Sequence, residues 1–328
     1  MPSISRRRLL AAAGLVGAAP AWASGGPPEA GGGSYPSRPI KIIAPFSAGG
    51  GTDFISRVLS TRLAQALGQP IVVENRAGAN GVIGADAVAK AAPDGYTLLI
   101  GTAGSNGINA AVYEKLPFDT VRDFAGISLL ARAPMLLLAH PSVKANNAQE
   151  LIAEVKRSGV PYSYSTAGIG SVGHAAGVLF AQTTGAELTH VPYKGAAPAV
   201  VDLMSGQVKL MFGTTVSTLQ YVRAGNVKVL GVTTAQPSPS APGVVPLAHQ
   251  GLPGFDVATW YGLLAPGRTP PAIVEHVSAR LRAVLAEPEV QQQFLDQKLE
   301  IVGNTPAEFD AQVRREVEKW TRIGKALR

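Results

Sequence analysis

Two glycine-rich segments have the residue types and spacing that suit anion binding. Ser47–Asp53 reads Ser-Ala-Gly-Gly-Gly-Thr-Asp, and Thr166–Ser171 reads Thr-Ala-Gly-Ile-Gly-Ser. Both lack bulky side chains, so their backbone N–H groups can approach a ligand closely. Each precedes a predicted helix, whose N-terminal N–H groups and dipole favour negative charge. Two such segments facing each other could hold the two ends of a dianion, whereas one alone could equally serve as a tight turn.

The patterns expected of a catalytic centre are weak in this sequence. Ile169 stands where a Gly-x-Ser-x-Gly elbow around Ser171 would need glycine. Asp53 fits a helix cap better than a general base, and His174 could contact a ligand or bond only to a neighbouring loop. The chain has no cysteine, which excludes a thiol nucleophile or a thiolate metal site. No metal-ligand spacing relates the histidines, which are His140, His174, His190, His249 and His276. We therefore expect a protein that is not an enzyme and has no cofactor or metal.

One motif favours a different reading. Gly168-x-Gly170-x-x-Gly173 matches the dinucleotide-binding fingerprint, and Glu187 lies about twenty residues further on, as that motif requires. Glu187, however, falls at the start of the next predicted strand, whereas a ribose-binding acid sits at the carboxyl end. A dinucleotide-binding enzyme is therefore the weaker alternative.

The elements that must position these segments alternate between strands and helices. A strand at 39–45 leads into the first segment, and the following helix shows apolar residues at helical spacing from Ile55 to Leu67. Thr52 or Asp53 is predicted to cap this helix, and Gly68 to end it. The other predicted strands are 70–74, 96–101, 124–140, 162–166, 188–192, 208–212, 227–233 and 260–265. The other predicted helices are 81–91, 148–158, 171–183, 197–205, 217–224, 271–285, 288–297 and 306–327.

This alternation predicts an α/β fold with a mostly parallel sheet. Ligands of such sheets bind beyond the carboxyl ends of the strands, where both glycine-rich segments lie. The stretch 124–140, broken by Pro134, is predicted to cross between two lobes. The length of 328 residues is compatible with two domains. The net charge of +7 is scattered and not clustered with aromatic residues, which argues against nucleic-acid binding.

The N-terminus has the features of an export signal. Three arginines, Arg6 to Arg8, precede an apolar stretch at 9–19 that is too short to span a bilayer, and Ala21-Trp22-Ala23 resembles a cleavage site. We expect a signal peptide at 1–23, of the Sec or the twin-arginine type, and a flexible leader at 24–37. No cysteine is available for a lipid anchor, so the expected product is a soluble, unanchored periplasmic protein.

Seven segments of the chain resemble the Bug-type solute receptors of tripartite tricarboxylate transporters. They are Pro45–Asp53, Val73–Gly81, Ala92–Thr97, His190–Gly195, Ser205–Val208, Gly262–Pro266 and Thr305–Phe309. They occur in order from about Tyr35 to the C-terminus, so the resemblance covers nearly the whole chain outside the signal.

The resemblance implies a type II periplasmic-binding-protein fold, with two lobes that close on a ligand in a central cleft. Lobe 1 would hold 38–133 and 234–328, and lobe 2 would hold 134–233. The family pattern places the ligand carboxylate against backbone amides of both segments. Carried over by position, the binding residues are Phe46, Ser47, Ala48, Gly51, Thr52 and Asp53 on one side, and Thr166, Gly168, Gly170, Ser171 and His174 on the other. Thr102 and Ser105 are expected to line the same cleft.

Gly213 departs from the family pattern. Many relatives carry Asp after the Met-Phe pair that is Met211-Phe212 here. Glycine removes an acceptor and a negative charge and is expected to leave more room. We therefore expect weak binding of amino acids and tolerance of bulkier or more anionic carboxylates.

The resemblance implies a monomeric receptor that delivers a dicarboxylate, tricarboxylate or aromatic acid to the membrane permease subunits of a tripartite tricarboxylate transporter. A second possibility is a ligand sensor that docks on a signalling histidine kinase. An exported hydrolase is disfavoured because no nucleophile elbow is present.

Overall fold

The computed structural model describes residues 35–193, 195–324 and 327. The predicted signal peptide, and the predicted leader up to residue 34, lie outside the described residues. From Tyr35 onward the chain packs as one compact unit. The Tyr35 hydroxyl donates to the Gly95 carbonyl oxygen at 2.7 Å, so the ordered structure includes the last residues of the predicted leader.

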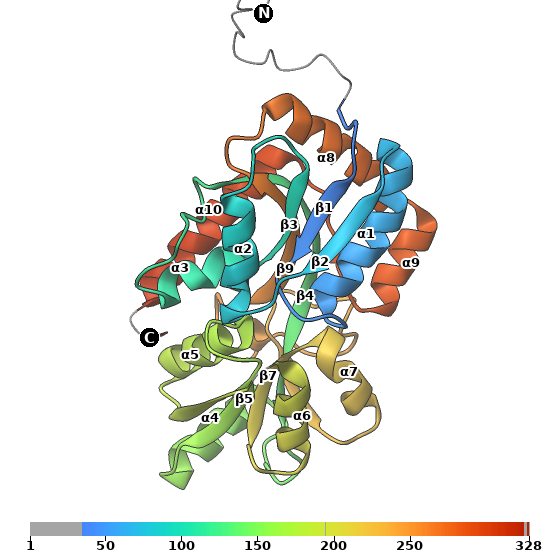
Figure 1. The fold of residues 1–328 in the computed structure, drawn as a ribbon. Helices are drawn as coiled ribbons and strands as arrows, with labels where there is room; N and C mark the ends of the chain where they lie inside the picture. Colours follow the sequence, from blue (N-terminus) through green and yellow to red (C-terminus); the bar gives the residue numbers. More distant parts are fainter. Residues whose placement is uncertain (1–34, 194, 325–326, 328) are drawn as a thin grey trace, which may run out of the picture. The chain divides into compact units, whose positions relative to one another are not determined.

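The described elements alternate along the chain as predicted (Figure 1). The strands are β1 Ile40–Ala44, β2 Ile71–Asn75, β3 Thr97–Thr102, β4 Phe124–Ala139, β5 Tyr162–Thr166, β6 Leu188–Pro192, β7 Leu210–Thr214, β8 Lys228–Val232, β9 Ala258–Pro266 and β10 Glu300–Ile301. The α-helices are α1 Gly51–Leu67, α2 Val82–Ala89, α3 Asn109–Val112, α4 Ala148–Ser158, α5 Val172–Thr184, α6 Ala196–Met204, α7 Thr215–Arg223, α8 Pro271–Leu285, α9 Pro288–Asp296 and α10 Pro306–Ile323. Short helical turns are η1 Ala79–Gly81, η2 Gly104–Ile108 and η3 Leu247–His249.

The strands form a mixed sheet in the order β2-β1-β3-β9-β4-β7-β5-β6, with β8 and β10 also paired to β4. Pairing is parallel at both ends, among β1, β2 and β3 and among β5, β6 and β7, and antiparallel around β4 and β9. The long strand β4 pairs with β9 up to Pro134 and with β7 from Met135 onward. We call β1, β2, β3, β9, β10 and the part of β4 up to Pro134, with the helices packed on them, the first half of the fold. The second half consists of β5 to β8, the rest of β4 and their helices. The predicted α/β fold class is confirmed. The sheet is mixed rather than mostly parallel, because antiparallel pairs surround β4 and β9.

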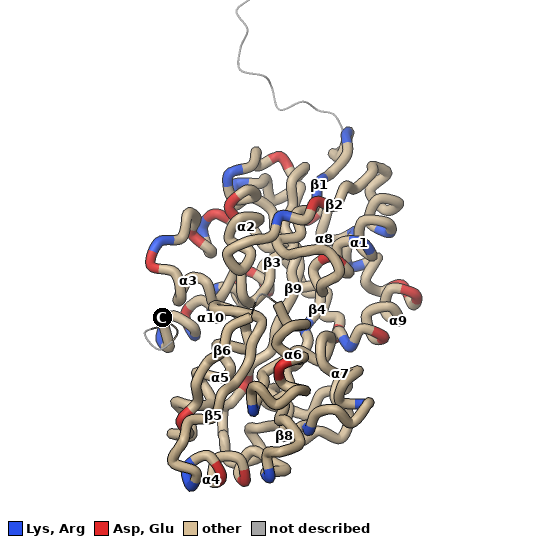
Figure 2. The backbone as a smooth tube through the Cα atoms, turned by 60° about the horizontal axis from the view of Figure 1, so that its bottom comes forward, with Lys and Arg blue, Asp and Glu red and all other residues tan. Residues whose placement is uncertain are grey.

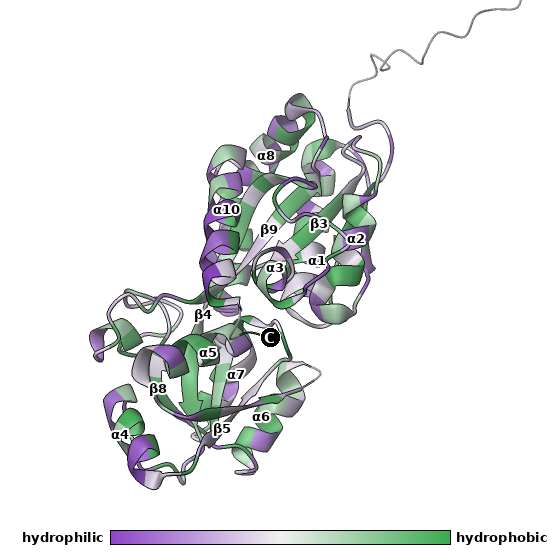
Figure 3. Cartoon of the chain, turned by 90° about the vertical axis from the view of Figure 1, so that its left-hand side faces the viewer, coloured by the Kyte–Doolittle hydropathy of each residue, from purple (hydrophilic) through white to green (hydrophobic). Residues whose placement is uncertain are grey.

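Both faces of each half are covered by helices because the central strands carry apolar residues on both of their faces. Ile42 packs with α1, α8 and α9, while its neighbour Ile43 packs in the core that holds α2 and α10. In the second half, Leu136 of β4 faces the core that holds α6, and Leu137 faces the core that holds α4 and α5. This alternation is the period of two of a strand buried on both sides. Figure 3 shows the hydrophobic strands against helices such as α10 that carry hydrophilic residues.

The start of α1 differs from the prediction. The helix begins at Gly51, its N-cap is Gly50, and no side chain caps it, so neither Thr52 nor Asp53 is the cap. Both lie in the first turn, because the glycine-rich backbone already turns one residue earlier. The sequence also failed to predict η2 and α3, since residues 104–112 are mostly small and show no apolar period.

Charged residues of both signs are distributed along the helices and loops (Figure 2). None of the described helices combines the length and hydrophobicity needed to span a bilayer.

Candidate functional site

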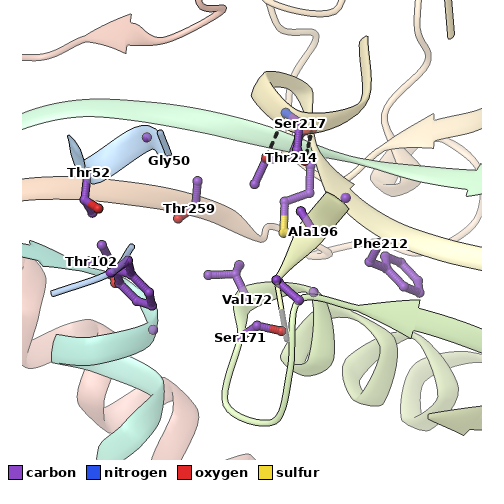
Figure 4. A pocket seen from close by; sticks show the side chains of 18 of the residues that line it. Gly50, Thr52, Thr102, Ser171, Val172, Ala196, Phe212, Thr214, Ser217 and Thr259 are labelled. Atoms are coloured by element: carbon purple, nitrogen blue, oxygen red, sulfur yellow. Dashed lines mark hydrogen bonds between the residues drawn. The ribbon is translucent and has the colours of Figure 1, made fainter. Parts of the chain in front are cut away.

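A cavity of about 260 Å³ lies at the carboxyl ends of β1, β3, β5, β6 and β7. Its wall comes from both halves of the fold: Figure 4 shows Thr52, Thr102 and Thr259 on one side and Ser171, Val172 and Ala196 on the other. Six of the predicted binding residues line it, namely Phe46, Gly51, Thr52, Thr102, Ser171 and Gly213. The other eight are not in the wall: Ser47, Ala48, Asp53, Ser105, Thr166, Gly168, Gly170 and His174. Among these eight, Ser105, Gly170 and His174 are hydrogen-bonded to the lining residues Thr102, Asn80 and Ser171.

The N-terminus of α1 presents unoccupied donors to the cavity. Gly50, Gly51 and Thr52 all line it, and the helix has no side-chain cap to bind its first N–H groups. Thr52 is only 3% exposed, and its hydroxyl has no hydrogen-bond partner among the described residues. A buried hydroxyl without a partner costs free energy. This end of the cavity is therefore equipped to donate to an anion.

Asp53 holds this corner in place rather than facing the cavity. Its Oδ2 accepts from the Gly49 N–H at 3.0 Å and from Arg57 Nε at 3.0 Å. The hydrogen bond from Arg57 is the largest of the causes that hold the pKa of Asp53 below its usual value, so the carboxylate stays ionised at neutral pH. A carboxylate in this state is a poor general base, as the sequence suggested.

Tyr261 is a cavity residue that the sequence analysis missed. It faces Thr102 across the antiparallel β3–β9 pair. A Cβ at Gly51 would lie 2.7 Å from its hydroxyl oxygen, so only glycine fits there beside Tyr261. Burial raises the pKa of Tyr261 to about 12, which keeps the hydroxyl protonated and able to donate.

The second glycine-rich segment is braced by two stacked histidines. His174 and His190 have ring centroids 4.1 Å apart. His174 Nδ1 accepts from the Gly170 N–H at 3.4 Å, and His190 Nε2 is 2.7 Å from Thr166 Oγ1, which also accepts from the Gly168 N–H. Burial lowers the pKa of both rings, that of His190 to about 4, so both are neutral at pH 7. These histidines therefore orient the loop from outside the cavity.

Two further helices also begin at the cavity. α6 starts after Gly195 without a side-chain cap, and α7 starts after Thr214, whose hydroxyl accepts from the Ser217 N–H at 3.3 Å. With α1 and α5, four helices have their N-terminal residues in the wall. The sequence pattern that identified the N-termini of α1 and α5, a small or hydroxyl residue at a strand-to-helix junction, could also have identified those of α6 and α7.

The rest of the wall is largely apolar. Phe46, Met135, Val172, Met211 and Phe212 contribute to it, and none of the described lining residues is charged. Negative charge in this cavity would be matched by backbone N–H groups and hydroxyls alone. No cluster of three or more His, Asp or Glu among the described residues could hold a metal ion.

The extra room expected beside Gly213 is not open. A Cβ at this position would lie 2.5 Å from Thr218 Cγ2 and 3.0 Å from Met211 Cε. These two side chains fill the space into which a larger residue would extend. The expectation of a larger cavity at Gly213 is therefore wrong, although the missing acceptor and charge remain.

Comparisons with known proteins place the chain among periplasmic receptors. Residues 55–328 match the family described as "Tripartite tricarboxylate transporter family receptor". BugT of Bordetella pertussis is 34% identical over 291 residues, which cover 88% of this chain and 89% of that protein. Rpa4515 of R. palustris, solved with adipate, gives a TM-score of 0.81 at 33% identity, over 89% of this chain and 98% of that one. MatC of Rhodopseudomonas palustris, solved with bound malate, gives 0.79 at 33% identity, over 88% and 100%.

Proposed function

Because the chain belongs to the tripartite tricarboxylate transporter receptor family, we propose that it captures a small carboxylate in the cavity between the two halves of its fold. The predicted resemblance to Bug-type receptors is confirmed, and the family is one of periplasmic solute-binding receptors. The carboxylate would accept hydrogen bonds from the N-terminus of α1 and from the helices that begin in the second half.

One observation carries this proposal: four helix N-termini and an unpartnered, buried Thr52 hydroxyl line a cavity whose described wall holds no charged side chain. Helix N-termini favour anions through their free N–H groups and their dipole. Two related receptors have adipate and malate bound.

The arrangement of Ser171 argues against a hydrolase. Its hydroxyl accepts from the His174 N–H as the N-cap of α5, and His174 Nδ1 accepts from Gly170. His174 Nδ1 is thus occupied, and among the described residues no hydrogen bond joins Ser171 Oγ to a side chain that could take its proton. Ser171 serves as a helix cap whose neighbouring N–H groups bind the ligand.

The chemistry of the wall also limits the ligand. An ammonium group buried here would meet no carboxylate among the described lining residues, and an unpaired buried charge is strongly unfavourable. Amino acids should therefore bind poorly. The apolar wall favours acids with an aliphatic or aromatic body.

Closure around the ligand would bend the fold where the chain crosses between its halves, near Pro134. Thr233 links three crossing segments: its N–H donates to the Met135 carbonyl oxygen at 2.9 Å, and its carbonyl oxygen accepts from the Val257 N–H at 2.9 Å. The predicted lobe boundaries at 133/134 and 233/234 fall at this junction. We propose it as the hinge of a monomeric receptor, which hands its ligand to the permease subunits of a tripartite tricarboxylate transporter in the periplasm.

A thermal-shift experiment tests the binding proposal. Protein stripped of co-purified ligand by unfolding and refolding would be heated with adipate, malate, citrate or benzoate, with adipamide as the uncharged control and aspartate as the amino-acid control. A ligand at 100 times its Kd stabilises by about 2.7 kcal/mol, which is roughly 4 °C for a chain of this size. No shift with any of the four acids, in protein shown to be refolded, would refute the proposal.

A further inference from the structure

One side chain that lines the cavity forms a hydrogen bond from the first half to the second. Asn80, in the turn η1 of the first half, donates from Nδ2 to the Gly170 carbonyl oxygen of the second half at 2.7 Å. Gly170 belongs to the glycine-rich segment that leads into α5. Asn80 itself lines the cavity. The bond therefore joins a cavity residue of the first half directly to the second glycine-rich segment.

The Asn80 side chain is held in the geometry that this bond needs. Its Nδ2 also donates to Asn109 Oδ1 at 2.9 Å, and Asn109 Nδ2 donates back to the Asn80 carbonyl oxygen at 3.0 Å. Asn109, at the start of α3, is fully buried. This reciprocal pair fixes the side-chain amide of Asn80, so both of its Nδ2 hydrogens have acceptors.

The backbone around Asn80 is also unusual. Ala79 and Asn80 have φ of 46° and 50°, between Gly78 at 139° and Gly81 at 87°. Non-glycine residues rarely adopt this left-handed region, and such conformations persist only where surrounding contacts hold them. The turn leads directly into α2 at Val82 and places the Asn80 side chain against Gly170 of the second half.

Two glycines allow the halves to approach this closely. A Cβ at Gly170 would lie 2.9 Å from both Asn80 Nδ2 and Asn109 Oδ1. A Cβ at Gly104 would lie 3.2 Å from Asn80 Nδ2 and 3.5 Å from the Gly170 carbonyl oxygen. The space between the two halves at this contact thus holds only backbone atoms and the side-chain amide of Asn80.

We propose that Asn80 is an interdomain latch: by binding the Gly170 carbonyl oxygen it holds the second glycine-rich segment against the first half and slows release of the ligand. The slowing of ligand release rests on the proposed function, whereas the contact between the halves does not, since it forms without a ligand. Asn80 is a positioning residue in this proposal, and its effect on binding acts through the closed fold.

The absence of cysteine makes the latch measurable. Gln65→Cys on α1 and Arg157→Cys on α4 place two exposed labelling sites in the two halves. Spin-label distances would be recorded in this background with Asn80, with Asn80→Gly and with Asn80→Asp. Glycine suits the left-handed turn and removes only the side chain, and aspartate keeps its shape but loses both donors. Asn226→Gly, which removes an exposed asparagine in a distant turn, is the matched control.

We expect both Asn80 variants to increase the ratio of long to short distances about fivefold, the factor that one net hydrogen bond is worth. The control should leave the distribution unchanged. Identical distributions for Asn80→Gly, Asn80→Asp and the parent protein would overturn the latch. Melting temperatures within 2–3 °C of the parent, about the shift expected for one such bond, would confirm that the variants are folded.

The second measurement is the dissociation rate of adipate by stopped flow. We expect a three- to tenfold faster rate in Asn80→Gly and a much smaller change in the association rate. Unchanged dissociation with altered distances would overturn the role in ligand release. If adipate and the other three acids fail to bind the parent protein, the proposed function fails, whereas the distance measurement still decides the latch.

Discussion

Replacing Thr52 with valine should make the protein more stable and its ligand binding weaker. The Thr52 hydroxyl is buried beside the cavity without a hydrogen-bond partner among the described residues. Valine has the same shape and no polar atom to leave unsatisfied. An unsatisfied buried polar group costs about 1–3 kcal/mol, and water entering the cavity would offset part of that cost. We expect a gain of about 1 kcal/mol in the free energy of unfolding.

The magnitude can be carried to an assay. A chain of this size gains roughly 0.6 kcal/mol/K of entropy on unfolding, so about 1 kcal/mol raises the melting temperature by about 2 °C. The same hydroxyl would donate to the ligand carboxylate, and a hydrogen bond to a charged group is worth about 1.5–3 kcal/mol. The Kd for a carboxylate should therefore rise about 10- to 150-fold, measured by calorimetric titration.

Two controls separate the hydroxyl from other effects. Thr52→Ser keeps the hydroxyl and should keep most of the affinity. Thr61→Val makes the same change at an exposed position of the same helix and should leave both binding and stability nearly unchanged. A Thr52→Val variant that is less stable than the parent, yet binds carboxylates as tightly, would refute the reasoning.

Three further outcomes follow from the same site. Gly51→Ala should reduce carboxylate affinity at least tenfold, because its Cβ would lie 2.7 Å from the Tyr261 hydroxyl oxygen, and Tyr261→Phe should restore part of the affinity in the double variant. Gly213→Asp should lower the free energy of unfolding by about 1–3 kcal/mol, because the new side chain would overpack against Thr218 Cγ2. Thr218→Ser removes that methyl group. In a double-mutant cycle measured by denaturant unfolding, it should recover at least half of the loss. The folded-state pKa of His190 is about 4, below the usual 6.5, so the unfolded chain binds a proton first and stability should fall as pH drops from 6.5 to 4. At about 1.4 kcal/mol per pH unit the upper limit of this loss is about 3.5 kcal/mol, and solvent screening reduces it. Melting curves of His190→Gln should show a smaller loss of stability toward low pH, and an equal loss would contradict the lowered pKa of His190 as its cause.

The sequence predicted the elements best where local signals mark both ends. α4 has the predicted bounds, 148–158, because Asn147 accepts from the Glu150 N–H as its N-cap and Gly159, at φ 64°, ends the helix. β7 was predicted at 208–212 and runs from Leu210 to Thr214. Its position is set by pairing with β4 and β5. Such register depends on distant partners and leaves no local mark in the sequence.

The candidate site shows the same division. The glycine-rich corners could be predicted because glycine before a helix has a local physical meaning. Tyr261 could not, because it reaches the cavity through the pairing of β9 with β3, more than 150 residues away in the chain. The different positions of Ser171 and His174 could not be predicted either: Ser171 lines the cavity, whereas His174 binds the Gly170 N–H and lies outside the lining.

The proposed recognition of the ligand by backbone N–H groups has a consequence for selectivity. Four helix N-termini attract any anion, so they cannot by themselves distinguish one carboxylate from another. Discrimination between carboxylates must then come from the shape and polarity of the remaining wall. Clashes and unpaired polar groups in that wall can lower the affinity for one acid relative to another. Here that wall includes Met211, Phe212 and Gly213, with Thr218 packed against the glycine. Substitutions at these positions should change which acid is bound while the amide-rich corners keep binding acids as a class.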